Sequence, residues 1–376
     1  MNILFVSEYY YPHIGGVEAV FKNLAERLAE QGHRCHLVTS SLPGAPRHEY
    51  INNVEIYRVN VPRKGNRYWF SFLAIPGVIK MARQADVIHT TTYNAVLPAW
   101  MASRITGTKS VITIHEIWGN QWLKLSGMNF FIAGVYRSIE KILLKLSFDA
   151  TICVSDYTYN RARELKLKKD KLRAIHNGID NNLFTSKSNK EILRQELGLP
   201  ENSFIYMYYG RPGVSKGVEY LIQAVPMISK RIPDSRLVLI LSRDPKNRYK
   251  TIIDAIKNMN IENDIILLNP VPVDILVDYI SASDCVVVPS LSEGFGFAAA
   301  EACAMGKPVI ASNVASLPEV VSGEYVMIES ANAKAIADGV IKTFNGDTQK
   351  SERKTFDWNK CALQYLDVYK TVTSGI

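Results

Sequence analysis

The sequence predicts an α/β protein with two domains, each formed around a doubly wound parallel sheet. The chain of 376 residues is longer than one core of ordinary size requires. Short apolar runs alternate with helical stretches through both halves, as they do when crossover helices join parallel strands. The run Cys285–Val288 is rich in β-branched residues without polar alternation, which is typical of a strand covered on both faces.

The first half begins with a strand and a helix that ends at Gly32, directly before the next strand. The expected strands are Ile3–Ser7, Cys35–Thr39, Val54–Val59, Val87–Thr90, Val111–His115 and Thr151–Val154, and the expected helical stretches are Ala19–Glu30 and Val78–Arg83.

The second half repeats this alternation. The expected strands are Phe204–Tyr209, Leu237–Leu241, Ile265–Leu268, Cys285–Val288 and Val309–Ala311, and the expected helices are Val218–Ile228, Thr251–Met259, Val273–Ser281, Phe297–Met305 and Ala333–Phe344. The polar stretch Thr185–Lys190 is the predicted linker. We therefore expect domains at residues 1–184 and 185–355, followed by a final helix over residues 356–376.

Composition favours a protein of the cytoplasm. The five cysteines are odd in number, widely spaced and set in apolar patterns, so we expect reduced core thiols and no zinc site. The first residues lack a basic leader and a small-residue cleavage site, and the apolar stretches are too short to span a bilayer. The positive charge lies in the first half: up to Asp180 there are 23 Lys and Arg against 14 Asp and Glu, a balance of +9. The remainder has 21 against 22, a balance of −1. This asymmetry suggests that the first domain faces an anionic surface, although a basic solvated surface would give the same count.

Glu293 and Glu301 frame the most informative segment. They follow the strand at Cys285–Val288, and between them lie two glycines and the start of an alanine-rich helix. A strand, a glycine loop and a helix in that order form a phosphate site at the carboxyl edge of a sheet. Carboxylates there accept hydrogen bonds from hydroxyls, so the pattern predicts a phosphorylated ligand rich in hydroxyls, such as a nucleotide sugar. We expect Glu293 to stand in an exposed loop.

These glutamates resemble the E-x7-E signature of the retaining family 4 glycosyltransferases. The resemblance extends over most of the chain through the ordered motifs Gly15-Gly16-Val17-Glu18, Thr113-Ile114-His115-Glu116, Asn177-Gly178-Ile179-Asp180, Gly210-Arg211 with Lys216-Gly217, and Leu317-Pro318-Glu319-Val320-Val321. It implies the GT-B fold, in which two Rossmann-like domains face a central cleft and the final helix crosses back onto the first domain. It also implies that the first domain binds the acceptor and the second binds the nucleotide sugar.

The donor site implied by the resemblance combines cations, glycines and carboxylates. Its residues are Gly15, Gly16, Arg211, Lys216, Glu293, Gly294, Phe295, Gly296, Phe297 and Glu301. Arg211 and Lys216 suit a diphosphate because Arg offers a planar fork and Lys a point charge, although incidental charges in a solvated loop are the alternative. Glu293 would hold sugar hydroxyls and Glu301 the ribose. A tight turn would explain the paired glycines equally well.

The resemblance also assigns residues of the first domain. His115 would lie near the 6-hydroxyl of the donor sugar and the reacting face, so His115, Glu293, Arg211 and Lys216 form the expected catalytic set. Asn177 and Gly178 would border the cleft, although Asn-Gly is also a common turn. Two stretches depart from the family pattern: Ser242-Arg243-Asp244-Pro245 replaces a Gly-x-Gly-Pro turn, and Ala315-Ser316 replaces two glycines.

The implied reaction transfers a hexose-type sugar from a UDP- or GDP-linked donor to a hydroxyl of a lipid-linked or glycan acceptor. The cations and the helix end would stabilise the leaving diphosphate without a metal or other cofactor. The acceptor would attack from the face that the phosphate leaves; a covalent intermediate on Glu293 is the competing mechanism. A sugar-nucleotide epimerase of the same fold and a non-catalytic nucleotide-sugar binding module remain alternatives.

Basic and aromatic residues are interleaved in two segments of the first domain. One joins Arg63, Lys64 and Arg67 to Tyr68, Trp69, Phe70 and Phe72, followed by Lys80 and Arg83. The other joins Trp118, Trp122, Lys124, Phe130 and Phe131 to Arg137, Lys141 and Lys145. This composition is typical of a segment lying in the interface of an anionic membrane. Nucleic acid would also suit it, but the predicted sugar-nucleotide site argues against that partner. The other alternative is that the aromatic rings are core. We expect peripheral association with the inner face of the cell membrane.

Overall fold

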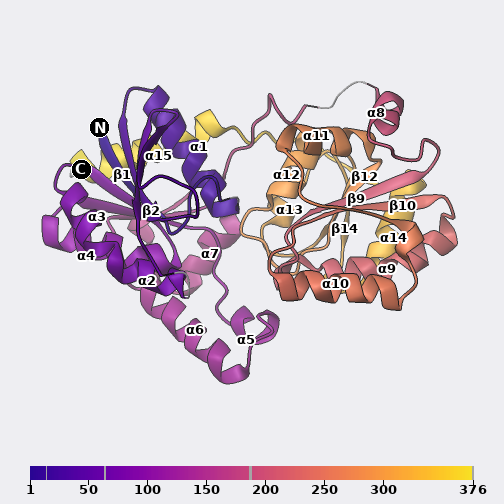
Figure 1. Cartoon of the computed structure of the whole chain (residues 1–376), viewed down its shortest axis with the longest axis horizontal. Helices are drawn as coiled ribbons and strands as arrows, with labels where there is room; N and C mark the ends of the chain where they lie inside the picture. Colours follow the sequence, from indigo (N-terminus) through magenta and orange to yellow (C-terminus); the bar gives the residue numbers. More distant parts are fainter. Residues whose placement is uncertain (14, 63–64, 186–188, 375–376) are drawn as a thin grey trace. The chain divides into compact units, whose positions relative to one another are not determined.

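The computed structural model describes residues 1–13, 15–62, 65–185 and 189–374, which form two compact units (Figure 1). The first unit comprises Met1–Leu123, Met128–Gly178 and Asp357–Ile376, and the second comprises Lys124–Gly127 and Ile179–Phe356. Both have the α/β architecture that the alternating sequence pattern predicts.

The first unit is built around an eight-stranded sheet in the order β3-β4-β2-β1-β5-β6-β7-β8. Its strands are β1 (Asn2–Val6), β2 (Arg34–Ser40), β3 (His48–Ile51), β4 (Val54–Val59), β5 (Val87–Thr91), β6 (Lys109–Ile114), β7 (Ala150–Cys153) and β8 (Leu172–Ala174). Neighbouring strands are parallel except β3 and β4. The strand order changes direction between β1 and β5, and such a switch point opens a crevice at the carboxyl ends of the strands.

Helices cover both faces of this sheet (Figure 1). They are α1 (Gly16–Glu30), α2 (Asn66–Leu73), α3 (Ile75–Ala82), α4 (Val96–Thr106), α6 (Phe130–Leu144), α7 (Asp156–Glu164) and α15 (Trp358–Ser374), and the short α5 (Gln121–Leu125) follows β6. The last helix, α15, is joined to the sheet by buried hydrogen bonds. The Tyr369 hydroxyl lies 2.6 Å from His89 Nδ1, and the Tyr365 hydroxyl lies 3.1 Å from Thr113 Oγ1.

The second unit is built around a seven-stranded sheet in the order β11-β10-β9-β12-β13-β14-β15. Its strands are β9 (Phe204–Gly210), β10 (Ser235–Leu241), β11 (Ile265–Leu268), β12 (Cys285–Val288), β13 (Val309–Ser312), β14 (Glu324–Ile328) and β15 (Gln349–Lys350). The order changes direction between β9 and β12, so the switch point of this sheet lies where these two strands end.

The helices of the second unit also lie on both faces of its sheet, with α11 and α12 opposite α9 and α10 (Figure 1). They are α8 (Lys190–Glu196), α9 (Val218–Arg231), α10 (Lys246–Asn258), α11 (Val273–Ala282), α12 (Phe297–Ala304), α13 (Leu317–Val320) and α14 (Ala333–Phe344). Tyrosines from β9 and smaller apolar side chains from β10 and β12 form one core cluster with α9, α10 and α14.

The structure contains elements that the sequence did not predict, among them α2, α4, α6, α7, α8, β8 and β14. Each sheet carries one antiparallel edge strand, β3 in the first and β15 in the second, so neither sheet is purely parallel. Helix α6 had no predicted counterpart because its buried residues are only Ala133 and Glu140, which leaves a weak inward pattern. Within the predicted linker, residues 186–188 lie outside the described residues. No helix in the described part of the chain is both long and apolar enough to cross a bilayer.

Candidate active site

The loops after β9 and β12 form the candidate site in the second unit. These strands flank the switch point of their sheet, and their carboxyl ends carry Arg211 and Lys216 on one side and Glu293 on the other. The loops are joined directly, because Leu291 N donates to Ser215 O at 2.7 Å. Gly217 permits this approach. A Cβ at this position would lie 2.0 Å from Pro289 O, and its φ of +65° belongs to the left-handed region.

Lys216 and Glu293, 77 residues apart in the sequence, form an ion pair at the centre of the site. Lys216 Nζ lies 2.8 Å from both carboxylate oxygens of Glu293, and the Ser290 hydroxyl donates to Oε1 at 2.7 Å. The Ser316 hydroxyl donates to Glu293 O at 3.0 Å. The Glu293 side chain is only 12% exposed. The expectation of an exposed position is therefore wrong, because the Lys216 ammonium from the loop after β9 and the Ser290 hydroxyl from the same loop as Glu293 cover the carboxylate.

Glu301 lies on α12 and contacts a residue that sequence reasoning missed. The Tyr209 hydroxyl, at the end of β9, lies 2.9 Å from Glu301 Oε2 and 3.0 Å from Ala298 O. Burial raises the pKa of Glu301 to about 7, although the hydrogen bond with Tyr209 acts in the opposite direction. Glu301 is thus held in a poorly solvated position. The apolar sequence of β9 did not indicate that Tyr209 would reach α12.

The loop before α12 depends on a second glycine. Gly296, which caps the helix, has φ of +94°, and a Cβ there would lie 2.8 Å from Leu317 Cδ2. The Phe295 ring is buried and packs edge-on against Phe297 and Phe356. Phe295 therefore contributes its side chain to the core, and it fixes the backbone that runs from Gly294 to the helix.

Arg211 is exposed, and its backbone is held by a buried tyrosine. The Tyr208 hydroxyl donates to Arg211 O at 3.1 Å. Burial, followed by the nearby charge of Glu293, raises the pKa of Tyr208 well above its ordinary value, so this hydroxyl stays protonated. The backbone is fixed while the guanidinium faces solvent, an arrangement that suits a phosphate ligand.

Both departures from the family pattern lie on loops of this unit. Ala315 adopts φ of +51°, a left-handed conformation at a position where the resembled pattern has glycine. Ser242 N donates to Gly210 O at 3.1 Å, and Arg243 Nε donates to Asn269 Oδ1 at 2.8 Å. The loop after β10 is therefore joined to the ends of β9 and β11.

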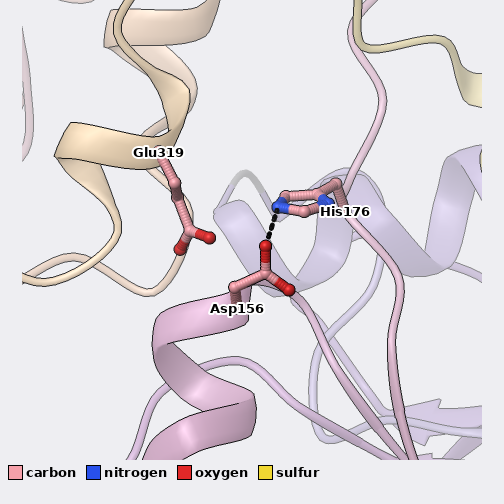
Figure 2. A group of neighbouring side chains, drawn as sticks. All are labelled: Asp156, His176 and Glu319. Atoms are coloured by element: carbon pink, nitrogen blue, oxygen red, sulfur yellow. Dashed lines mark ion pairs between the residues drawn. The ribbon is translucent and has the colours of Figure 1, made fainter.

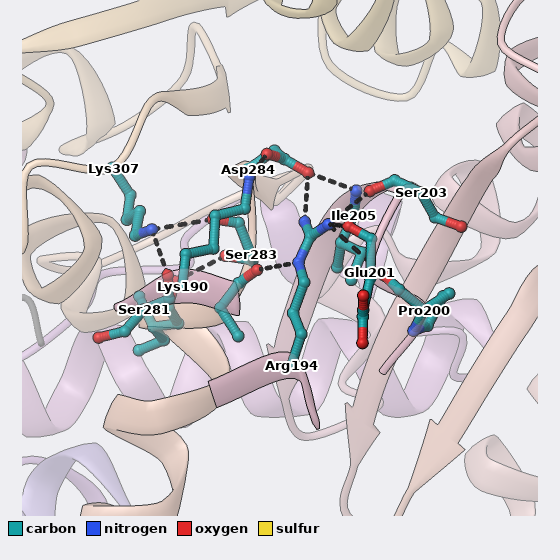
Figure 3. A network of polar contacts seen from close by, with 12 residues as sticks. Lys190, Arg194, Pro200, Glu201, Ser203, Ile205, Ser281, Ser283, Asp284 and Lys307 are labelled. Atoms are coloured by element: carbon teal, nitrogen blue, oxygen red, sulfur yellow. Dashed lines mark hydrogen bonds and ion pairs between the residues drawn. The ribbon is translucent and has the colours of Figure 1, made fainter. Parts of the chain in front are cut away.

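A polar network fixes the opposite ends of the two strands that carry the site (Figure 3). Asp284, directly before β12, accepts hydrogen bonds from Ile205 N at 2.6 Å and from Arg194 Nη2 at 2.8 Å, and it also pairs with Lys190. Arg194 is buried and donates to the backbone carbonyls of Ala282, Glu201 and Ser203. This network ties α8 to β9 and β12, and so it supports the relative position of the strands.

In the first unit, Gly15 and Gly16 begin α1 after β1, and His115 follows β6. The His115 ring lies 6.3 Å from the Phe21 ring of α1. Burial lowers the pKa of His115 to about 3, and its Nε2 is buried without a hydrogen-bond partner among the described residues. The imidazole is therefore neutral at physiological pH and has a free polar atom.

Asn177 and Gly178 lie against the start of α15. A Cβ at Gly178 would lie 2.3 Å from Trp358 N, so a close backbone crossing requires the glycine. Asn177 is buried, and its Oδ1 has no partner in the described part of the chain. Nearby, His176 Nε2 lies 3.9 Å from Asp156 Oδ2 (Figure 2). Both of these side chains are open to solvent, where such pairs contribute little.

Two family models match most of the chain. The model described as Glycosyltransferase Family 4 matches residues 14–183, and the model described as Glycosyl transferases group 1 matches residues 189–357. An uncharacterized glycosyltransferase of Methanocaldococcus jannaschii is 28% identical and covers 98% of both chains. Among solved structures, sucrose-phosphate synthase of Thermosynechococcus elongatus matches with a TM-score of 0.81 at 22% identity over 100% of both chains. Anabaena HepE, solved with UDP and glucose, matches with a TM-score of 0.79 at 19% identity over 99% of this chain and 100% of that one. The chain therefore belongs to the family 4, group 1 glycosyltransferases and has their two-domain GT-B fold.

Proposed function

We propose that the protein is a retaining, metal-independent glycosyltransferase that moves a hexose from a UDP- or GDP-linked donor to a hydroxyl of a lipid-linked or glycan acceptor. The observation that carries this proposal is the convergence of Lys216, Glu293, Arg211 and Glu301 on the switch point of the second sheet. Cations, carboxylates and a helix N-terminus at one sheet edge match the diphosphate and hydroxyl groups of a nucleotide sugar.

Arg211 and Lys216 bind the diphosphate, and the N-terminus of α12 adds its partial positive charge. Glu301, oriented by Tyr209, accepts hydrogen bonds from the ribose. These positive groups stabilise the charge that develops on the leaving diphosphate, so the reaction needs no metal. The HepE structure contains UDP and glucose, and although the likeness establishes only the fold, it makes UDP-glucose the first donor to test.

The acceptor oxygen attacks C1 of the sugar on the face that the phosphate leaves. The C1–O bond to the diphosphate breaks with its electron pair going to the phosphate oxygen, the new C1–O bond forms, and that phosphate oxygen takes the proton of the acceptor. Glu293 fits this mechanism better than a covalent one, because Lys216 and Ser290 already occupy its carboxylate oxygens. Neutral His115, with its free Nε2, suits a hydrogen bond to a sugar hydroxyl.

The decisive experiment combines donor binding with turnover. A thermal-shift screen of UDP- and GDP-sugars identifies the donor, because a bound ligand raises the melting temperature. Release of UDP or GDP that requires an acceptor hydroxyl then separates a transferase from an epimerase and from a binding module. EDTA should leave the rate unchanged, and inhibition that magnesium restores would refute the metal-free mechanism. Glu293→Ala should abolish transfer, and a variant as active as the wild type would refute the site.

The acceptor side of the proposal rests on an exposed apolar surface of the first unit, which we call the aromatic face. It consists of Tyr68, Trp69 and Phe72 on α2 and Phe130, Phe131, Ile139 and Ile142 on α6, all at least 45% exposed. The hydroxyls of Tyr68 and Tyr136 contact each other and join the two helices. Phe70 is core, as the alternative interpretation expected, and Trp118 and Trp122 are half-buried, whereas Tyr68, Trp69, Phe72, Phe130 and Phe131 are exposed.

Arg137 and Lys141 are exposed on α6, and Lys145 is exposed directly after it. The aromatic face therefore combines apolar side chains with positive charge. This combination fits the interface of an anionic bilayer, where aromatic rings lie at headgroup level and each basic residue contributes about 1 kcal/mol. We therefore place the first unit at an anionic membrane surface. Of the predicted basic cluster, Arg63 and Lys64 lie outside the described residues, and the side chain of Arg67 is not described.

Sedimentation with phosphatidylglycerol vesicles tests this placement. Binding should decrease with salt, and it should be lost when Phe130 and Phe131 become Ser or when Arg137, Lys141 and Lys145 become Gln. Changing Lys166, Lys168 and Lys169 to Gln is the matched control, because it removes the same charge from exposed positions elsewhere in the unit. Equal loss of binding in this control would mean that net charge alone accounts for vesicle binding and that the aromatic face has no specific role. No binding at low salt would favour a soluble acceptor.

A further inference from the structure

Glu140 is a buried carboxylate on α6 that the proposed chemistry does not use. It is 5% exposed, and Ala133 is the only other buried residue of this helix. A buried carboxylate is unfavourable unless hydrogen bonds compensate for the lost water. The hydrogen-bond partners of Glu140 therefore show what compensates for its burial.

The partners belong to the loop that follows His115. Trp118 N donates to Glu140 Oε1 at 3.0 Å, and Gly119 N donates to Oε2 at 2.6 Å. One carboxylate thus binds two successive backbone amides and fixes the loop as it leaves β6. His115 lies three residues before Trp118, at the start of the same loop.

A third hydrogen bond comes from a residue with a strained backbone. The Tyr93 hydroxyl donates to Glu140 Oε1 at 3.1 Å, and Tyr93 has φ of +70°, which is unusual for a bulky side chain. Such strain persists only where the surrounding structure holds it, and it is concentrated at functional sites. Tyr93 follows β5, a strand of the switch point, so the Glu140 contacts join α6 to two loops at the carboxyl edge of the sheet.

The opposite side of α6 is apolar and uncovered. Phe131, Val135, Ile139 and Ile142 follow one another at intervals of four, four and three residues, which places them on one stripe of the helix, and each is at least 43% exposed. On the inner side a cavity of ≈ 10 Å³, lined by Glu140, Tyr93 and Glu116, leaves room for about one water molecule. Leu143 and Leu144 of α6 pack against two small core clusters, and Tyr136 stacks on Trp122. A ligand on the outer stripe can change how firmly the helix docks through these contacts and through Glu140.

We propose that Glu140 is a positioning residue through which α6 sets the conformation of the His115 loop, and that an anionic bilayer bound to the outer stripe of α6 stabilises the ordered loop. This inference rests on the proposed function for the role of His115 and adds lipid regulation to it. A bilayer shifts the loop equilibrium only if it binds the docked helix better than the undocked one. The docked helix presents the whole stripe on one plane, whereas an undocked or frayed helix does not. By linkage, a ligand that orders the loop also strengthens binding to the bilayer.

Hydrogen exchange of the full chain, followed by mass spectrometry, tests the inference without a sugar donor or an acceptor. In Glu140→Gln, the Trp118 and Gly119 amides lose a carboxylate acceptor and should exchange about tenfold faster, the change expected for one charge-assisted hydrogen bond. Peptides from the second unit should be unaffected. Phosphatidylglycerol vesicles should slow exchange of these amides in the wild type and have no such effect in Glu140→Gln.

Ser138→Ala is the matched control, because Ser138 is exposed on the same helix and its hydroxyl donates to Gly134 O, within the helix itself. If Glu140→Gln fails to fold, Tyr93→Phe removes one of the three hydrogen bonds and should give a smaller effect of the same sign. Once the donor is known, Glu140→Gln should lower kcat more than it raises the donor KM, since the diphosphate ligands lie in the second unit.

Unchanged exchange at Trp118 and Gly119 in folded Glu140→Gln would overturn the positioning role. Wild-type protein that sediments with the vesicles but exchanges these amides at the same rate would overturn the lipid coupling. Because neither measurement involves turnover, these failures are distinguishable from a failure of the proposed transferase activity.

Discussion

The raised pKa of Glu301 predicts that replacing this carboxyl by an amide stabilises the protein at neutral pH while weakening donor binding. Glu301→Gln keeps the size of the side chain and one acceptor oxygen, so the contact with Tyr209 is retained, but it replaces the other oxygen by an NH2 donor. It removes the charge that burial disfavours. The variant should therefore separate the stability cost of the residue from its role in binding the ribose.

The magnitude follows from the shift of the pKa from 4.5 to about 7. Below pH 4.5 the carboxyl is protonated in both states and costs nothing. Between pH 4.5 and 7 the unfolded chain releases the proton while the folded protein retains it, so the unfolded state binds fewer protons and stability falls as pH rises. Above pH 7 both states are ionised and the loss is complete, at most about 3 kcal/mol at 1.36 kcal/mol for each pKa unit.

Urea unfolding of wild type and Glu301→Gln at several pH values between 5 and 8 measures this difference. The variant should gain little at pH 5 and up to about 3 kcal/mol at pH 8, and other titrations cancel in the comparison. Tyr209→Phe is the companion variant. It removes the hydrogen bond that lowers the pKa of Glu301, so the decrease in folding stability with rising pH should continue to a higher pH than in the wild type. A difference between wild type and Glu301→Gln that is constant across the range would refute the reasoning, because Glu301 would then be solvated in the folded state.

Three further variants and one control variant test the site and its support. Lys216→Met should weaken UDP or GDP binding by about 1.5–3 kcal/mol in calorimetry; unchanged affinity would place the diphosphate elsewhere. Gly217→Ala should lower the free energy of unfolding by about 2 kcal/mol or more, because its Cβ meets Pro289 O and its φ is positive. Gly213→Ala is the control and should leave the free energy of unfolding nearly unchanged, because its Cβ would make an ordinary 3.4 Å contact. If both alanine variants lost the same stability, the clash at Gly217 would not be the cause. Arg194→Met should cost about 3–5 kcal/mol because it leaves Asp284 without its guanidinium partner; a stable variant would show that the network is dispensable.

Much of the fold was predictable, because short runs of neighbouring residues in the sequence indicate where strands and loops lie. Val and Ile runs without polar alternation predicted the central strands of both sheets, and glycines predicted the loops at their carboxyl ends. The edge strands β3 and β15 were not predicted, since an edge strand is half solvated and its sequence resembles a loop. Helix α6 was missed for a related reason: its exposed stripe is as apolar as a buried one, and its main inward anchor, Glu140, is charged.

For the candidate site, the sequence determined which residues stand in which loops, because a strand, its glycine turn and the helix that follows are adjacent in the chain. It therefore placed Glu293, Arg211 and Lys216 at strand ends and Glu301 on the helix that follows the loop. The tertiary structure decided their partners. The pairing of Lys216 with Glu293, the reach of Tyr209 to Glu301, and the hold of Glu140 on the His115 loop join segments that are far apart or on different elements. Hydrogen bonds and desolvation depend on distances of a few ångströms between such segments, and these distances arise only when the sheet brings the strand ends together.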